Sequence, residues 1–327
     1  DYDNTAPEKF CVIPPGVDLE KFYPYNSRIP LDEETAKLLQ TISNQLLNFF
    51  VRIEKPLILT VCRPDKRKNI TGLIKAYGED EDLQEKANLA IFAGIREDIQ
   101  EMPDNEREVL TDILLLMDKY NLYGKMAIPK RHNTQTEVPE LYRIAADTGG
   151  VFTNVALTEP FGLTLIEAAA SGVPVVATDD GGPRDILENC KNGILVDVSD
   201  SKNISEAIKK IIYDKKLWRQ FSEGGMKNVK KYYTWKAHVQ TYLKEVEELV
   251  EKGQDNQKVF ALVGKKLLDA EKLIVSDIDH TLIGEDDGLE EFIKVLNYAG
   301  NKVGFAVATG RTVDSAFSVL KEYKVPY

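Results

Sequence analysis

The sequence predicts an α/β fold in which helices cover both faces of a parallel sheet. From about residue 55 onward, short apolar runs alternate with segments of helical periodicity, which is the pattern of repeated strand–helix units. The apolar runs are nearly continuous, as expected for strands that are buried on both faces. The chain has 327 residues, which is too long for one ordinary core, so we expect two domains.

Six short apolar runs are the expected strands of the first domain, with helices between them. The strands are residues 56–61, 88–93, 125–128, 150–153, 174–177 and 193–196. The helices are residues 70–79, 106–120, 138–146 and 163–171. Gly172 follows the last of these helices as a C′ glycine does, and Pro174 comes shortly after it. In a sheet of this kind, ligands bind beyond the C-terminal ends of the strands.

The composition argues against several classes of partner. Lys and Arg number 42 and Asp and Glu number 53, which gives a net charge of −11, so we expect neither nucleic acid nor an anionic membrane as a general partner. We find no apolar run near the ~20 residues of a membrane span and no signal peptide. Cys11, Cys62 and Cys190 lack zinc or disulfide spacing, so we expect reduced thiols in a cytoplasmic protein. The chain starts without Met and ends just after a helical pattern, so we expect a fragment.

The segment EPFGLTLIEAAASGVPVVATDDGG, residues 159–182, carries the strongest chemical signal. Glu159 and Glu167 bracket the start of a helix that opens at Phe-Gly-Leu. Gly162 lets a ligand approach the backbone, and the free N–H groups of a helix start favour an anion. Phosphate at the helix start with a carboxylate on either side describes a sugar-nucleotide pocket. The alternative is one Glu that stabilises the helix dipole and a second on a solvated face; this spacing alone leaves both open.

A basic turn follows the first strand in the segment CRPDKRKNI. Arg63 lies at the end of the strand and Lys68 where the next helix begins. Arginine and lysine are the usual partners of phosphate oxygens, so a cluster of them in an acidic chain indicates a diphosphate site. We expect Arg63 and Lys68 to contact the ligand and Arg67 or Lys66 to point to water. The alternative is a solvated basic turn that is paired locally with Asp65.

A second α/β unit is expected after an amphipathic helix at 234–250 and a linker at 251–270. It starts with a strand at 272–275 and ends after one strand–helix–strand–helix pass, so residues 271–327 are not expected to complete a domain. The motif VSDIDHTL places Asp277 and Asp279 just after this strand, and VATGRT places Thr309 after the next one. Paired carboxylates at a strand end suit a nucleophile and a proton donor, with Mg²⁺ to offset phosphate charge.

Two of three weaker signals keep two interpretations each. His132 is either a ligand contact or a surface-loop histidine. Residues 181–183, Gly-Gly-Pro, either line the donor pocket or form a strand-to-helix turn in which Pro183 is the first helical residue. His238, on the amphipathic helix, is expected to be structural.

The turn R-x-D-x-x-K-N (Arg63, Asp65, Lys68, Asn69) followed by E-x7-E (Glu159, Glu167) resembles the retaining glycosyltransferases of the two-domain GT-B fold. Residues 10–250 resemble the sucrose-phosphate synthases in this group, through RPDKRKNITGLIKAYGE, YNLYGKMAIPKRHNTQTEVPELYRIAA and VALTEPFGLTLIEAAASGVPVVATDDGGP. The resemblance implies that residues 1–250 are the C-terminal, Rossmann-like, nucleotide-sugar-binding domain. The helix around Trp235 would cross toward an N-terminal domain, which holds the sugar-phosphate acceptor and is absent from this chain.

The resemblance also implies roles for single residues. Arg63 and Lys68 would neutralise the β-phosphate of the leaving UDP, Glu159 would bind the glucose hydroxyls, and Glu167 the ribose. Backbone amides would meet the phosphate and donor sugar at Phe161, Gly162 and Leu163. A loop would run past the uracil at Pro129, Lys130 and His132. Two cations and a helix start can stabilise the leaving charge without a metal, so no cofactor is expected for the transferase.

The motif D-x-D-x-T followed by T-G-R resembles the haloacid-dehalogenase-like (HAD) phosphatases, and within them the sucrose-phosphatase branch. Asp277 would be the nucleophile and Asp279 the acid/base. Both would contribute to a Mg²⁺ site, and Thr309 and Gly310 would hold the phosphoryl group. The alternative is a degenerate regulatory domain. Since the later lysine and acidic motifs and the cap would follow Tyr327, this fragment is not expected to hydrolyse phosphate esters by itself.

These resemblances imply a parent enzyme that transfers glucose from UDP-glucose to fructose 6-phosphate, and whose product, sucrose 6-phosphate, the second unit would dephosphorylate. One alternative is a sucrose synthase or another retaining transferase. A second is a HAD sugar-phosphate phosphohydrolase whose transferase-like domain only senses a nucleotide, and a third is a noncatalytic docking module. The sequence leaves open whether the donor carries UDP or ADP and whether the phosphatase unit is active.

Overall fold

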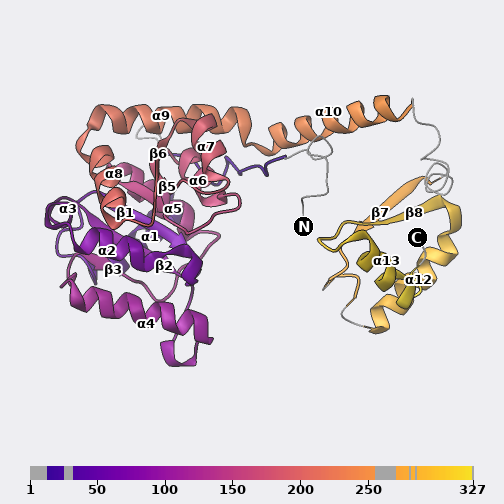
Figure 1. Cartoon of the computed structure of the whole chain (residues 1–327), viewed down its shortest axis with the longest axis horizontal. Helices are drawn as coiled ribbons and strands as arrows, with labels where there is room; N and C mark the ends of the chain where they lie inside the picture. The colour runs from indigo at the N-terminus through magenta and orange to yellow at the C-terminus, as the bar shows by residue number, and fades with distance from the viewer. Residues whose placement is uncertain (1–12, 26–31, 255–269, 280, 284–285, 326–327) are drawn as a thin grey trace. The chain divides into compact units, whose positions relative to one another are not determined.

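The computed structural model describes residues 13–25, 32–254, 270–279, 281–283 and 286–325, so Cys11 and most of the expected linker lie outside the described residues. The chain divides into two compact units, Asp1–Leu243 and Lys244–Tyr327 (Figure 1). The division falls within helix α10 (Trp235–Gln254).

The described part of the first unit contains a six-stranded parallel sheet with the order β3-β2-β1-β4-β5-β6. Its strands are β1 (Leu57–Cys62), β2 (Asn88–Ala93), β3 (Met126–Ala127), β4 (Val151–Asn154), β5 (Val175–Thr178) and β6 (Gly193–Val196). The predicted parallel sheet is therefore confirmed, with every strand within one residue of its expected ends. The chain reverses its direction of winding between β1 and β4, which is where doubly wound sheets bind ligands.

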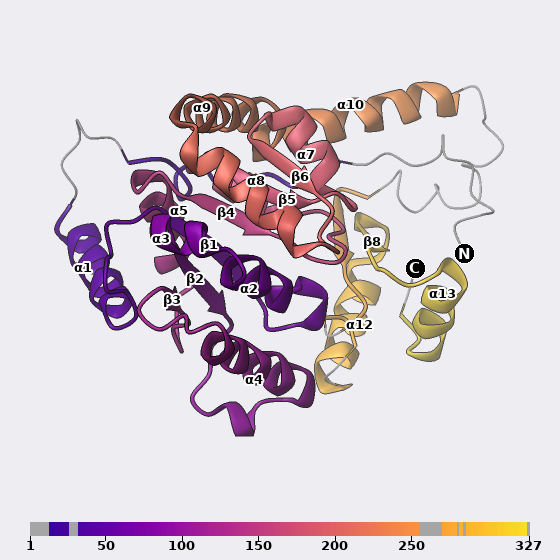
Figure 2. The ribbon, with the colours of Figure 1, turned by 60° about the vertical axis from the view of Figure 1, so that its left-hand side comes forward.

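Helices cover both faces of this sheet. One face carries α2 (Ile70–Gly78), α3 (Glu81–Lys86), α4 (Asp104–Lys119) and α8 (Ser201–Tyr213) (Figure 2). The other carries α1 (Glu33–Leu47), α5 (Glu137–Asp147), α6 (Leu163–Ala170), α7 (Pro183–Cys190) and α9 (Lys215–Tyr232). Successive side chains of β1 enter opposite cores, since Leu57 and Leu59 pack on the second face and Ile58 on the first.

The four helices expected between strands correspond to α2, α4, α5 and α6. The predictions did not include α1, α3, α8 or α9. In α9, Gly224 and Gly225 interrupt the helical pattern. Gly225 has a packing reason: a Cβ at this position would lie 3.3 Å from the Cα of Ala169, so the absence of a side chain lets α9 approach α6 closely.

A buried ion pair on α5 holds the N-terminal segment 13–25 against the rest of the first unit. Glu140 and Arg143 pair with side chains that are 4% and 5% exposed. The Tyr25 hydroxyl donates to Glu140 Oε2 at 2.6 Å, and Arg143 donates to the carbonyl of Lys21 at 3.0 Å. Burial and the adjacent Glu140 carboxylate raise the pKa of Tyr25. The Arg143 guanidinium also lies 4.3 Å from the Tyr23 ring centroid.

The junction of α9 and α10 holds the first residues of the same segment. Val17 N–H donates to the Tyr233 carbonyl at 2.8 Å, and His238 Nδ1 donates to the Pro14 carbonyl at 2.9 Å. A Cβ on Gly16 would lie 2.2 Å from the Trp235 backbone nitrogen, so this crossing requires glycine. His238 thus has the structural contact expected of it.

The second unit is one strand–helix–strand–helix pass, as predicted. It consists of β7 (Lys272–Ser276), α12 (Asp286–Ala299), β8 (Val303–Val307) and α13 (Val313–Glu322), with β7 and β8 parallel. Its small core contains Leu282, Leu289, Leu320 and Val325. On β7, Leu273 and Val275 are more than half exposed.

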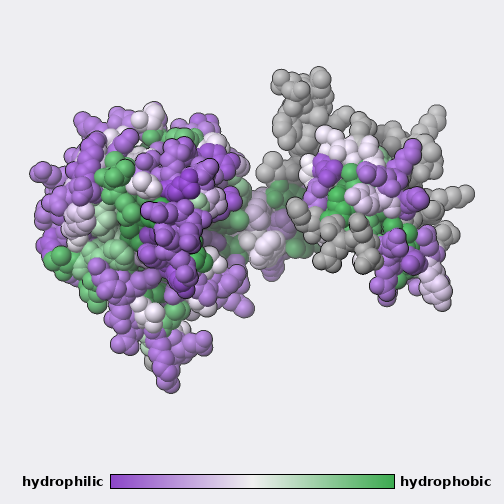
Figure 3. Space-filling model, turned by 90° about the horizontal axis from the view of Figure 1, so that it is seen from below, coloured by the Kyte–Doolittle hydropathy of each residue, from purple (hydrophilic) through white to green (hydrophobic). Residues whose placement is uncertain are grey.

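Short 3₁₀ turns complete the secondary structure at η2 (Lys66–Lys68), η3 (Ile99–Glu101) and η4 (Gly300–Lys302). Hydrophilic residues cover most of the face of the first unit in Figure 3. Among the described helices, none combines the length and apolar character needed to cross a bilayer.

The buried pair on α5 predicts a large stability effect. Glu140→Gln leaves the Arg143 charge buried without a carboxylate, so we expect the free energy of unfolding of the first unit to fall by about 3 kcal/mol. Urea unfolding followed by tryptophan fluorescence measures it, since both tryptophans, Trp218 and Trp235, lie in this unit.

The matched control is Glu206→Gln, the same substitution in the exposed pair with Lys202. It should change the free energy of unfolding by less than about 0.5 kcal/mol. Equal effects of the two substitutions would contradict the structural importance of the buried pair.

Candidate functional site

A pocket of about 830 Å³ lies where the winding of the sheet reverses. Three segments line it: residues 13–15, residues 60–68 at the end of β1, and residues 152–164 from β4 to the start of α6. Polar side chains that follow two neighbouring strands therefore meet in one cavity, although they are far apart in the sequence.

The cationic side chains of the basic turn after β1 differ in their hydrogen-bond and ion-pair partners. Asp65 caps η2 by accepting from the Arg67 backbone N–H at 2.9 Å, and the Arg67 guanidinium forks onto the same carboxylate at 3.1 and 2.7 Å. These hydrogen bonds lower the pKa of Asp65 to about 2. Lys66 pairs with Glu108 at 2.6 Å, whereas Arg63 lines the pocket without an ion pair to any residue that the structure describes. Arg63 is therefore the cation of this turn that is most available to an anion.

Lys68 and Glu159 meet across the pocket. Lys68 Nζ donates to Glu159 Oε2 at 2.7 Å, and the two side chains are 27% and 12% exposed. Asn154, the last residue of β4, donates to the same carboxylate oxygen at 3.0 Å and approaches the Thr164 hydroxyl at 3.4 Å. The fold thus brings together two predicted site residues that lie 91 positions apart, and Asn154 orients the carboxylate.

The start of α6 supplies backbone donors to the same pocket. Gly162 caps the helix with φ 102° in the left-handed region, a conformation that favours glycine. Within the described chain, we find no intramolecular acceptor for the backbone N–H groups of Phe161, Gly162 and Leu163. Free N–H groups of this kind, at the positive end of a helix, suit a phosphate or a sugar oxygen.

The Gly-Gly-Pro turn supports this loop instead of lining the pocket. A Cβ on Gly181 would lie 2.3 Å from the Glu159 carbonyl oxygen, and one on Gly182 would lie 2.3 Å from that of Phe161. Pro183 is the first residue of α7. The turn is thus a strand-to-helix connection, and a contact of it with the donor stays a prediction.

Glu167 lies one helical turn further along α6, beside the residues that line the pocket. The Tyr142 hydroxyl donates to its Oε2 at 3.0 Å. Burial raises the pKa of Glu167, while the Tyr142 hydrogen bond and the charge of Lys21 oppose the shift. Tyr142 is fully buried, and its own pKa is raised by burial and by Glu167. Glu159 and Glu167 therefore occupy different environments, one paired with a lysine and one with a tyrosine.

The loop 129–132 follows β3, outside the residues that line the pocket. Lys130 Nζ donates to the Glu97 carbonyl at 2.8 Å. His132 is 7% exposed and packs edge-on to Phe92, with ring centroids 5.7 Å apart. Its Nδ1 has no hydrogen-bond partner, and burial lowers its pKa. The interpretation of His132 as a surface histidine is wrong, because the ring is buried against the end of β2.

The carboxylates of the second unit lie at the ends of its parallel strands. Asp277 follows β7 and accepts from the Ile278 N–H at 2.7 Å. Arg311 forks onto Asp279 through Nε at 2.9 Å and Nη2 at 2.5 Å, and its backbone N–H donates to Thr309 Oγ1 at 3.2 Å. Arg311 therefore links the loops that carry Asp279 and Thr309, each of which follows a strand as predicted. The sequence analysis did not single out Arg311, although it stands in the T-G-R motif.

Mg²⁺ prefers oxygen ligands of the kind that Asp277 and Asp279 offer. Among the described residues, no three His, Cys, Asp or Glu side chains are grouped to hold a metal. The two carboxylates therefore fit only a part of a Mg²⁺ coordination shell.

Several residues of the pocket were missed by the sequence analysis. Asn154 could have been found as the polar residue that directly follows a predicted strand. Cys62 also lines the pocket, and burial raises its pKa to about 12, so its thiol remains protonated at neutral pH. Residues 13–15 resemble the segment that enters such a domain, but they were not predicted at the pocket, because only the fold brings them there.

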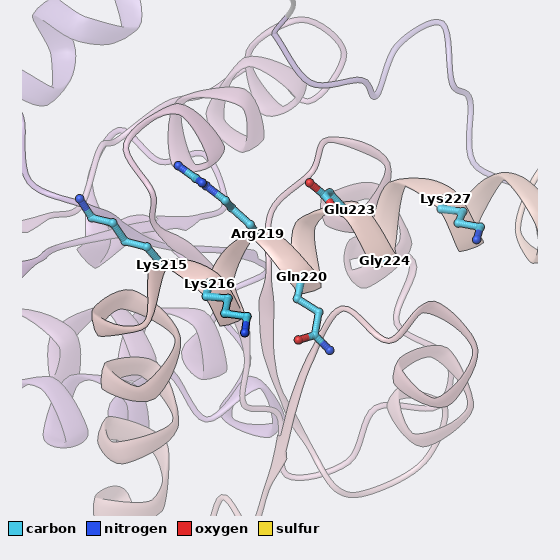
Figure 4. A pocket seen from close by; sticks show the side chains of 7 residues that line it. All are labelled: Lys215, Lys216, Arg219, Gln220, Glu223, Gly224 and Lys227. Carbon is cyan, nitrogen blue, oxygen red and sulfur yellow. The ribbon is translucent and has the colours of Figure 1, made fainter.

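A second hollow of about 680 Å³ lies along α9, between Lys215 and Lys227. Figure 4 shows its side chains spreading apart, with Arg219 and Gln220 on opposite sides of the helix. Since they do not converge on a common point, we assign no ligand to this basic surface.

Comparison with known families assigns both units. Residues 48–228 match the model of the glycosyl transferases group 1 family, and residues 270–327 match that of sucrose-6F-phosphate phosphohydrolase. Sucrose-phosphate synthase 4 from Arabidopsis thaliana is 41% identical over 297 residues, which cover 85% of this chain and 28% of the relative. The Zea mays sucrose-phosphate synthase is 44% identical over 248 residues, or 73% of this chain and 23% of the relative. The chain thus spans about a quarter of the curated relatives it matches.

Solved structures agree with this assignment. Sucrose-phosphate synthase from Thermosynechococcus elongatus aligns with a TM-score of 0.57 and 25% identity over 73% of this chain and 52% of that protein. A glycosyltransferase from Rickettsia africae aligns with a TM-score of 0.60 and 20% identity over 76% of this chain and 60% of that protein, which supports the fold. The predicted fold class, a Rossmann-like GT-B domain followed by a HAD-like α/β unit, is confirmed. The chain belongs to the glycosyl transferases group 1 family and is homologous to the sucrose-phosphate synthases.

Proposed function

We propose that the protein containing this chain transfers glucose from UDP-glucose to fructose 6-phosphate with retention, forming sucrose 6-phosphate. One observation carries the proposal: Arg63, Lys68, Glu159 and the free N–H groups at the start of α6 share a single pocket. Two cations and a helix start can bind a diphosphate, and a partly buried carboxylate can accept hydrogen bonds from sugar hydroxyls. The homologous sucrose-phosphate synthases support this choice of donor and acceptor.

The main catalytic task of the pocket would be to stabilise the leaving diphosphate. Arg63 would contact the β-phosphate directly, and Lys68 would do so while it orders Glu159. Glu159, held by Asn154 as well as by Lys68, would accept hydrogen bonds from the glucose hydroxyls. Glu167 would accept from the ribose hydroxyls, with Tyr142 orienting it. The nucleobase would lie along the loop that contains Pro129, Lys130 and His132.

The acceptor site would belong to a preceding GT-B domain. We propose residues 1–250 as the nucleotide-sugar domain, 251–270 as the linker and 271–327 as the start of the HAD-like domain. An apolar stripe on α10 supports contact with a further domain, since Trp235, Tyr242 and Leu243 are each more than half exposed. Free thiols at Cys62 and Cys190 support a cytoplasmic location.

The second unit would act on a sugar phosphate such as sucrose 6-phosphate. Asp277 would attack phosphorus, and Asp279 would move the proton of the leaving oxygen. Thr309 and the Gly310 backbone would hold the phosphoryl oxygens. Bound Mg²⁺, held in part by Asp277 and Asp279, would offset the charge of the phosphate. The link between Asp279 and the Thr309 loop through Arg311 favours this second activity.

An assay of the full-length protein with UDP-glucose and fructose 6-phosphate tests the proposal. We expect release of UDP that depends on fructose 6-phosphate. Release that depends on free fructose instead would favour a sucrose synthase. Phosphate release from sucrose 6-phosphate without any UDP release would favour a phosphohydrolase with a nucleotide-sensing domain, and neither activity would favour a docking module.

Arg63→Ala should reduce the rate of glucose transfer roughly a hundredfold. The substitution removes a charge that stabilises the leaving phosphate, and this stabilisation of the transition state is on the order of 3 kcal/mol. The rate constant for UDP release by the full-length protein measures this. Lys66→Ala is the control, because Lys66 lies in the same turn but pairs with Glu108 outside the pocket. A similar loss in both variants would contradict the role of Arg63.

The affinity for UDP should fall as the pH is lowered, and the fall should begin at a higher pH than the titration of a glutamate with an ordinary pKa would give. The raised pKa of Glu167 means that its carboxylate takes up a proton at a higher pH than a glutamate in water does, and the protonated group accepts ribose hydrogen bonds less well. Calorimetric titration with UDP between neutral pH and about pH 5 measures the effect. Glu167→Gln should bind UDP more weakly at neutral pH and lose this acid step. An unchanged acid step in Glu167→Gln would assign the titration to another group.

Asp277→Asn should abolish phosphate release from sucrose 6-phosphate and leave glucose transfer unchanged, because the two sites lie in separate units. Both activities of the full-length protein are measured on the same preparation. Glu290→Gln, an exposed substitution on α12, controls for general damage to the second unit. A matching loss of both activities in Asp277→Asn would contradict independent sites.

A further inference from the structure

The backbone N–H groups at the start of α6 need support from outside the helix. Among the described residues, no side chain caps this helix, and its Ncap residue, Gly162, has φ 102°. Glycine populates both signs of φ readily, so the residue itself does not fix this conformation. Free donors bind an anion most strongly when they are already held in the geometry that the anion requires. The contacts that hold Phe161, Gly162 and Leu163 therefore bear directly on the proposed diphosphate site.

The side chain of Phe161 packs against Tyr233, the residue at which α9 ends. The two ring centroids lie 6.5 Å apart and the ring planes meet at 61°, which is an edge-to-face arrangement. Tyr233 is 2% exposed and belongs to the hydrophobic core on this face of the sheet, whereas Phe161 is partly buried at the border of that core and lines the pocket. A ring at the edge of the pocket is thus held by a ring in the core.

The hydroxyl of Tyr233 fixes its ring through α7. It accepts from Asn189 Nδ2 at 2.9 Å and donates to the Asp185 carbonyl at 3.4 Å. Burial raises the pKa of Tyr233 to about 12, so the phenol keeps its proton at neutral pH. Helices α6, α7 and α9 pack against one another (Figure 1), and Tyr233 connects all three.

The start of α7 supports the same loop from its main-chain side. Gly182 N–H donates to the Glu159 carbonyl at 2.9 Å, and a Cβ on Gly182 would lie 2.5 Å from the Cα of Phe161. The loop therefore has α7 against its main chain and Tyr233 against the Phe161 ring. The Tyr233 hydroxyl joins these two supports, because both of its hydrogen-bond partners stand on α7.

We propose that Tyr233 is a positioning residue for glucose transfer, which holds the N–H donors of residues 161–163 in place for the diphosphate through the ring of Phe161. Tyr233 lies outside the residues that line the pocket and would not touch the ligand. Its ring would restrict rotation of the loop at Gly162, so that the three N–H groups keep one orientation. The inference rests on the proposed function, because it assumes that these donors bind the diphosphate of a sugar nucleotide.

Calorimetric titration of the full-length protein with UDP tests it, together with steady-state kinetics of glucose transfer. Tyr233→Leu keeps an apolar side chain but removes the ring contact, and the backbone carbonyl can still accept from Val17. We expect the Kd for UDP and the KM for UDP-glucose to rise about tenfold, with a binding stoichiometry equal to that of the wild type. The KM for fructose 6-phosphate should stay within about twofold of the wild type.

Further variants distinguish positioning from simple structural support. Partial unfolding would lower the stoichiometry and kcat but leave Kd and KM unchanged. Tyr233→Phe keeps the ring and should restore most of the affinity for UDP. Tyr77→Leu is the matched control, since Tyr77 is fully buried on the other face of the sheet and its hydroxyl donates to the Ala87 carbonyl; its Kd for UDP should equal that of the wild type. If Tyr233→Leu does not fold, Phe161→Leu carries the test, because it removes the other ring of the pair.

Other outcomes would overturn the inference. A Kd for UDP within about twofold of the wild type in Tyr233→Leu would make Tyr233 a packing residue only, and an equal rise in Tyr77→Leu would assign the effect to a general loss of packing. A wild type that binds no UDP would defeat the proposed function instead. In that case, hydrogen exchange at Leu165, whose N–H donates to the Gly162 carbonyl at 2.9 Å, still decides the positioning. It should be about tenfold faster in Tyr233→Leu and unchanged in Tyr77→Leu, and equal rates in the two variants would overturn the inference.

Discussion

The contact of Lys68 with Glu159 at the reversal between β1 and β4 is the interaction on which the candidate site depends. Parallel pairing of these two strands places the turn after β1 beside the loop that opens α6. Asn154 then fixes the carboxylate, and Gly162 turns the helix start toward the same space. A cation, a carboxylate and free backbone donors thus converge on one pocket.

Buried polar contacts around this point hold the parts of the site in place. The pair of Glu140 with Arg143 holds the N-terminal segment that reaches the pocket, and Tyr142, between them in sequence, holds Glu167. Arg96 holds the loop after β3 in a similar way. Each contact involves a charged group that is removed from water, which is unfavourable unless well-oriented hydrogen bonds or ion pairs compensate the charge. They lie toward the C-terminal edge of the sheet, where doubly wound folds bind ligands.

The sequence was sufficient for the sheet, because continuous apolar runs of four to six residues mark strands that are buried on both faces. It also placed Arg63 at the end of a strand and Lys68 and Glu159 near the starts of helices, and the fold brings these three residues to one pocket. It did not predict α9, whose Gly224–Gly225 pair reads as a break although it allows close packing on α6. Nor did it predict the roles of Asn154 and Arg96 or the burial of His132. These follow from side-chain direction and tertiary packing, which a local pattern does not contain.

The central claim is that the pocket at the reversal of winding holds the diphosphate of a sugar nucleotide. A crystal structure of the full-length protein with bound UDP tests it most directly. The account predicts β-phosphate oxygens within hydrogen-bonding distance of Arg63 and of the Gly162 and Leu163 N–H groups, with the ribose hydroxyls at Glu167. UDP bound elsewhere, or bound here with its phosphates away from Arg63 and the start of α6, would contradict it.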